Sequence, residues 1–156
     1  MQDDKFTRLR ELSRQRIRVI WEIAGLDESR LTADERVLVE AMRQHPEYYD
    51  LWSRLDQVPD TEFERNGTNP ILHVIIHQII ENQIAANKPP ETAQTLEKLL
   101  QQGLSRHEAI HTIGSAIARD IYEIMKFQRP FDEQRYVRRL RHFVRPAQRP
   151  KRSRRF

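Results

Sequence analysis

Apolar residues recur at spacings of three and four along most of this chain, and no stretch sustains the period-two alternation of a half-buried strand. The pattern therefore predicts seven helices and no strand. Their expected spans are about 4–24, 33–44, 46–55, 70–86, 91–102, 105–127 and 133–143, and residues 57–68 are expected to form a loop.

Start and stop signals bracket these segments. Polar residues and proline mark the helix starts, and glycine marks two of the ends. The starts are the capping-box pairs Thr32/Glu35 and Ser105/Glu108, the caps Asn69 and Asp132, and the prolines Pro46 and Pro70; the stops are Gly25 and Gly103.

The composition fits one all-α domain. The 156 residues, 38% of them hydrophobic and 32% charged, suffice for a single core. The absence of cysteine excludes disulfides, cysteine zinc sites and thiol nucleophiles. The first residues show neither the apolar core of a signal peptide nor the ~18 apolar residues of a membrane span. We expect a cytoplasmic, single-domain bundle of about seven helices over residues 1–144.

Positive charge is concentrated at the C-terminal end. From Arg129 to Phe156, eleven Lys or Arg residues accompany two acidic ones, so this stretch carries +9 and the rest of the chain −5. Residues 145–156 contain six cationic side chains, two prolines and no acid. Such a segment buries too little apolar surface to order itself, and it is predicted to be a disordered basic tail.

Four of the six histidines form two pairs of equal spacing, His73/His77 and His107/His111, each near the start of a predicted helix. Residues four apart stand on one helix face, as paired metal ligands do. If consecutive helices pack antiparallel, both pairs lie at the same end of the bundle. We therefore predict one transition-metal site, with zinc or iron favoured, that uses all four histidines. No organic cofactor is predicted.

Two glutamates are the nearest candidates for a catalytic base in metal-assisted hydrolysis. Glu81 lies one turn beyond His77, and Glu108 lies inside a segment, HEAIH, that matches the H-E-x-x-H zinc-protease pattern. Glu108 also has a local role in its capping box, and the extended protease pattern is missing, so peptidase activity is disfavoured. His45 and Glu47 are further candidates, or simply an ordinary helix start.

Structural histidines are the alternative, since a histidine on a half-apolar helix face is often a satisfied boundary residue. The protein would then be a binding module for RNA, the ribosome or another anionic partner. A membrane or protein surface, or no partner at all, suits a basic tail equally well. The cationic residues in question are Arg135, Arg138, Arg139, Arg141, Arg145, Arg149, Lys151, Arg152, Arg154 and Arg155.

Several short blocks follow one another along the chain: His45-Pro46-Glu47-Tyr48, Asn69-Pro70-x-Leu72-His73 with His77 and Gln83, the segment from His107 to His111, Tyr122-Glu123, and Asp132-Glu133 with Tyr136. In this order they resemble the signature of a family of short bacterial proteins catalogued as domain of unknown function eighteen forty-one. The resemblance covers about Arg8 to Arg141, and its most specific part is the Asn-Pro-x-Leu-His-x-x-x-His block. It implies an all-helical cytoplasmic domain and no established activity.

Overall fold

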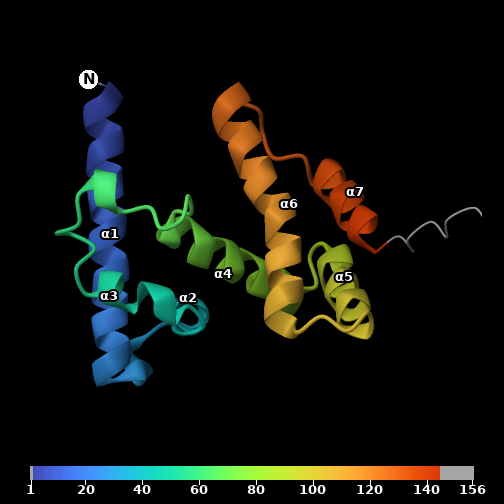
Figure 1. Cartoon of the computed structure of the whole chain (residues 1–156), viewed down its shortest axis with the longest axis horizontal. Coiled ribbons are helices and arrows are strands. Elements are labelled where there is room, and N and C mark those ends of the chain that lie inside the picture. The colour runs from blue at the N-terminus through green and yellow to red at the C-terminus, as the bar shows by residue number, and fades with distance from the viewer. Residues whose placement is uncertain (1, 145–156) are drawn as a thin grey trace, which may run out of the picture. The chain divides into compact units, whose positions relative to one another are not determined.

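The structure, a computed structural model, describes residues 2–144, with side chains for residue 8 and residues 10–144. Seven α-helices follow one another in the order predicted, and the described residues form no strand longer than an isolated bridge, so the all-α prediction is confirmed. The chain divides into two compact units between Ala86 and Asn87 (Figure 1). Among the described residues, no helix has the length and apolar character that a membrane span requires. The predicted tail, residues 145–156, lies outside the described residues.

The N-terminal unit is built from four α-helices and three short 3-10 helices, labelled η. They are α1 (Gln2–Leu26), η1 (Glu28–Arg30), α2 (Ala33–Arg43), η2 (Pro46–Tyr48), α3 (Tyr49–Trp52), η3 (Asp60–Glu62) and α4 (Pro70–Ala86). The predicted capping box at the start of α2 is present, with Thr32 and Glu35 each accepting from the other's backbone N–H. The predicted stop at Gly25 is slightly early, because α1 continues to Leu26.

The core of this unit forms where α2 and α4 pack against each other. Met42 of α2 and Val74 of α4 are fully buried there, together with Leu51 and Trp52 of α3. Burying a side chain of this size stabilises the fold by roughly 1.5–3 kcal/mol. The same packing fixes the end of α2 beside the first turns of α4.

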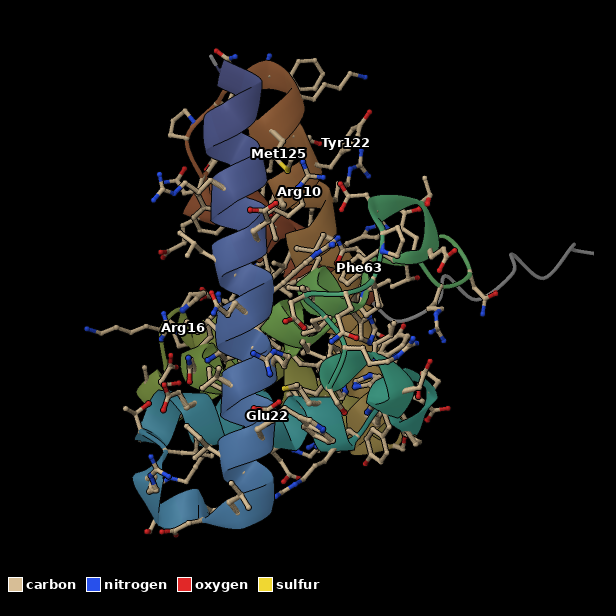
Figure 2. The ribbon with its side chains drawn as sticks, turned by 90° about the vertical axis from the view of Figure 1, so that its left-hand side faces the viewer. Arg10, Arg16, Glu22, Phe63, Tyr122 and Met125 are labelled. Atoms are coloured by element: carbon tan, nitrogen blue, oxygen red, sulfur yellow. The ribbon has the colours of Figure 1, made fainter. Side chains whose placement is uncertain are left out.

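The segment from 57 to 68 is the predicted loop, with η3 inside it, and Arg14 of α1 holds it in place. The Arg14 guanidinium donates to the carbonyl of Val58 (3.0 Å), pairs with Asp60 (2.7 Å) and lies 4.2 Å from the centre of the Phe63 ring. Phe63 is labelled in Figure 2, together with Arg10 of α1. Near the end of the loop, Asn66 and Gly67 form a tight turn with φ values of 53° and 74°.

The C-terminal unit contains α5 (Pro90–Gln101), α6 (Arg106–Phe127) and α7 (Glu133–Phe143), and each packs against the other two (Figure 1). At the end of α5, Gly103 has φ +95°, and the N–H groups of Gly103 and Leu104 donate back to the carbonyls of Leu100 and Leu99. This is the Schellman arrangement that glycine favours, and it confirms the predicted stop. The buried core residues are Leu96, Leu99, Ala109, Ile110, Ile113, Ala116, Ile117, Tyr136, Val137 and Leu140.

Candidate metal centre and basic surface

His45 follows the last residues of α2 and is 1% exposed. Its Nδ1 lies 2.7 Å from the carbonyl oxygen of Ala41. A carbonyl only accepts hydrogen bonds, so Nδ1 carries the proton and donates it. In the neutral ring, the lone pair available to a ligand therefore belongs to Nε2.

His73 and His77 stand one turn apart near the start of α4. The helix begins as predicted, with the Asn69 side chain accepting from the backbone N–H of Leu72. His77 is 3% exposed, and His73 is half-buried. Their ring centres lie 5.0 Å apart, so both imidazoles occupy one face of α4, as their spacing predicts.

The three rings form what we call the N-terminal histidine cluster: His45, His73 and His77. Nε2 of His45 lies 2.8 Å from Nε2 of His73, and the ring centres of His45 and His77 lie 4.6 Å apart. Nitrogens bound to one tetrahedral metal at 2.0–2.1 Å stand about 3.4 Å apart. In the present contact His73 donates from Nε2 to His45, so both nitrogens can bind one metal only after His73 shifts its proton to Nδ1.

Aromatic side chains form the wall behind this cluster. The Tyr48 ring stacks on His45 with centres 5.9 Å apart, and Trp52 contacts Tyr48 edge-on at the same separation. Burial raises the pKa of Tyr48 above its ordinary value, and the nearby Glu47 carboxylate adds to the rise. A buried apolar wall excludes water, which strengthens the interaction of any bound cation with its ligands.

The second pair, His107 and His111, lies in the first turns of α6 with ring centres 4.2 Å apart. In each unit, two histidines each place one ring nitrogen within 4.8 Å of the other's: His45 with His77, and His107 with His111. His107 is half-buried and His111 exposed. Each pair is therefore spaced for two bonds to one ion.

The two glutamates predicted as bases have different surroundings. The backbone N–H of Ser105 donates to Glu108 at 2.8 Å, and this bond lowers the pKa of Glu108, with the Ser105 side chain adding to the effect. The capping box predicted at the start of α6 is thus present. A lowered pKa makes Glu108 a weaker base near neutral pH. Glu81 is half-buried on α4, one turn after His77.

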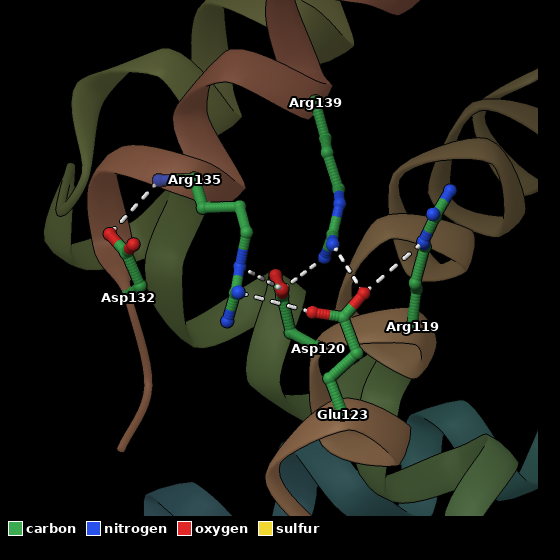
Figure 3. A network of polar contacts seen from close by, with 6 residues as sticks. All are labelled: Arg119, Asp120, Glu123, Asp132, Arg135 and Arg139. Carbon is green, nitrogen blue, oxygen red and sulfur yellow. Dashed lines mark hydrogen bonds and ion pairs between the residues drawn. The ribbon is translucent and has the colours of Figure 1, made fainter. Parts of the chain in front are cut away.

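The arginines predicted to contact an anionic partner differ in their intramolecular pairing. Arg135 and Arg139 of α7 pair with the Asp120 and Glu123 carboxylates of α6 (Figure 3). Arg138 is exposed, and Arg141 lies 3.5 Å from Glu91. The other six predicted cations, Arg145, Arg149, Lys151, Arg152, Arg154 and Arg155, lie outside the described residues.

His45 is the residue that the predicted ligand set lacks. It lies 28 positions before His73 and on another element, so no helical spacing connects the two. Only the packing of α2 on α4 brings them together. The available signals were its place at a helix end before proline and its position in the family-like blocks.

Comparison with known proteins is consistent with this description of the chain. No curated protein and no solved structure matches it. One family model matches residues 10–142, nearly the span over which the sequence showed its resemblance. Because that match covers most of the chain, the protein belongs to the family described as Domain of unknown function (DUF1841).

Proposed function

We propose that this protein binds a transition-metal ion through the N-terminal histidine cluster. The observation that carries the proposal is the environment of His45, which is buried and donates from Nδ1 to a backbone carbonyl. Metal-ligating histidines have this arrangement, because the outer hydrogen bond fixes the tautomer and aims the other nitrogen at the ion. In His45, that nitrogen faces His73.

We further propose that His107 and His111 complete the same coordination sphere, as the equal spacing of the two histidine pairs predicts. Neutral imidazole ligands suit zinc or iron, and the chain has no cysteine to offer instead. The metal would activate a bound water for hydrolysis by lowering its pKa towards 7. Glu81 is the better-placed base, because Glu108 is held in its capping box. The cytoplasm is the proposed compartment.

The decisive measurement is the metal content of tag-free protein, by elemental analysis after expression with added zinc or iron. We expect close to one equivalent per chain, and a melting temperature that falls when a chelator removes it. His73→Ala and His111→Ala alter half-buried or exposed rings, so both variants should fold and should each lower occupancy. The matched control is His142→Ala, which removes the sixth histidine, an exposed residue of α7.

Three outcomes are informative. Metal below about a tenth of an equivalent, with no thermal shift on adding zinc, iron, copper or nickel, overturns the proposal and favours structural histidines. Loss of metal from His73→Ala but not from His111→Ala limits the site to the N-terminal cluster. For the hydrolytic step, Glu81→Gln should retain the metal and slow hydrolysis of a screened ester or phosphoester substrate by about 10² or more.

A further inference from the structure

The C-terminal unit contains a groove between α6 and α7 that the metal proposal does not use. It encloses about 590 Å³. Both helices contribute to its walls, so a ligand in the groove is flanked on two sides. The side chains that give it its chemical character are Arg119 from α6 and Arg135, Arg138, Arg139, His142 and Phe143 from α7.

Two of these arginines are held in fixed positions. Arg139 pairs with Asp120 and with Glu123 (2.9 Å), and Arg135 lies 3.1 Å from Glu123 and 3.5 Å from Asp120. Figure 3 shows both guanidinium groups converging on the two carboxylates. Asp120 is 1% exposed, so the carboxylate that holds the two arginines lies beneath the surface. Because these arginines are already ordered, binding a ligand costs little further side-chain entropy.

The anchored arginines keep binding capacity. Each guanidinium has five N–H donors, and the contacts to Asp120 and Glu123 engage only two of its three nitrogens. Four guanidinium groups against two carboxylates also leave an excess of two positive charges at the groove. An anion with several oxygens is the complementary ligand.

The sequence after the groove favours a long anion over a small one. His142 and Phe143 lie in the last turn of α7, and residues 145–156 follow with six cationic side chains and no acid. A single phosphate group would satisfy the groove alone. A polymer of phosphates can neutralise the positive charge of both the groove and residues 145–156. The rings of His142 and Phe143 offer stacking surfaces for unpaired bases.

We propose that the groove between α6 and α7 binds the phosphodiester backbone of single-stranded RNA, with Arg119 and Arg138 as the exposed contacts and Arg135 and Arg139 as the fixed ones. A concave site suits a strand better than a membrane, whose surface is flat on this scale. Unpaired RNA is favoured over a duplex, since stacking on His142 or Phe143 requires splayed bases.

The test is fluorescence anisotropy of a labelled single-stranded oligouridylate with the full-length chain over a range of salt concentrations. Arg119→Ala and Arg138→Ala should each weaken binding about 5-fold and reduce the log–log salt slope by about 0.7. The matched control is Arg16→Ala, which removes an exposed arginine of α1 (Figure 2) and should change affinity less than about 2-fold. A fourth variant, the glutamine-tail protein, keeps the full length but carries glutamine in place of the six tail cations.

Each remaining outcome overturns the proposal. One such outcome is a wild type that fails to bind RNA even at low salt. Another is a pair of groove variants that bind RNA as tightly as Arg16→Ala. Loss of binding in the glutamine-tail protein, with the groove variants at wild-type affinity, would assign RNA binding to residues 145–156 alone. Binding to phosphatidylserine vesicles but not to RNA, with the same dependence on Arg119 and Arg138, would identify a lipid surface as the partner.

Discussion

Replacing Asp120 by asparagine should destabilise the protein, because this carboxylate anchors two arginines. Asp120 is 1% exposed and pairs with Arg135 and Arg139 (Figure 3). Asp120→Asn preserves the shape of the side chain and removes its charge. The two guanidinium groups then share only the Glu123 carboxylate, and they remain partly buried.

The magnitude follows from the burial of the partners. Removing one member of a fully buried ion pair costs about 3–5 kcal/mol. The Arg135 and Arg139 side chains are 22% and 18% exposed, and both keep a contact with Glu123, so part of this penalty is relieved. We therefore expect the free energy of unfolding to fall by about 2–3 kcal/mol.

The assay is urea unfolding followed by far-ultraviolet circular dichroism, with the free energy of unfolding taken by linear extrapolation. The control is Glu22→Gln on α1 (Figure 2), which breaks an exposed pair with Arg18 at 2.7 Å and should cost about 0.3–0.5 kcal/mol. A loss no larger for Asp120→Asn than for the control would refute the anchoring role. It would also remove the basis for treating Arg135 and Arg139 as fixed contacts.

Three further predictions concern single ionisable groups. Glu108→Gln should preserve the capping box and leave metal content and helicity at wild-type levels; a fall in hydrolysis rate by about 10² or more at unchanged metal content would instead make Glu108 the base. Burial opposes ionisation of Glu123, but Arg139 and Arg135 lower its pKa below the ordinary 4.5, so the stability it confers is complete above that pH and lost as the pH falls through the lowered value. Unfolding measured at several acidic pH values should show this loss in the wild type and much less of it in Glu123→Gln. Burial raises the pKa of Tyr136 to about 12, so spectrophotometric titration should show a late phenol ionisation that disappears in Tyr136→Phe.

The features predictable from the sequence were those decided within one helix. Thr32/Glu35 and Ser105/Glu108 act across a single turn, and both capping boxes are present. The placement of His73 and His77 on one face is equally local, since it depends only on helical periodicity. A residue-by-residue pattern carries this information because the interacting groups are neighbours along the chain.

The prediction of a loop over residues 57–68 did not include one local signal. Asn66-Gly67 is a sequence typical of a two-residue turn, because both residues tolerate positive φ. In the structure, the backbone N–H groups of Arg65 and Thr68 each donate to the other's carbonyl across this turn. The reading of residues 57–68 as a plain loop was right in extent but missed this turn.

Contacts between helices were the other gap. Arg135 and Arg139 were assigned to an anionic partner because the excess of basic residues marks that end of the chain. Their intramolecular partners, Asp120 and Glu123, stand on a different helix, and only the packing of α6 on α7 reveals the ion pairs. Net charge indicated the character of the surface, and packing showed which of its charges are held in place.

The proposed metal ligands differ in how they depend on folding. His45 approaches His73 only when α2 packs on α4, so the unfolded chain has no such site and ion binding there must stabilise the fold, by about 2.7 kcal/mol at a free metal concentration of 100 times Kd. His107 and His111 share one helix, and their spacing exists as soon as α6 forms. Replacing His45 should therefore destabilise the protein even without metal, because a buried ring and its bond to Ala41 are lost. Replacing exposed His111 should cost more stability when metal is present than when it is absent.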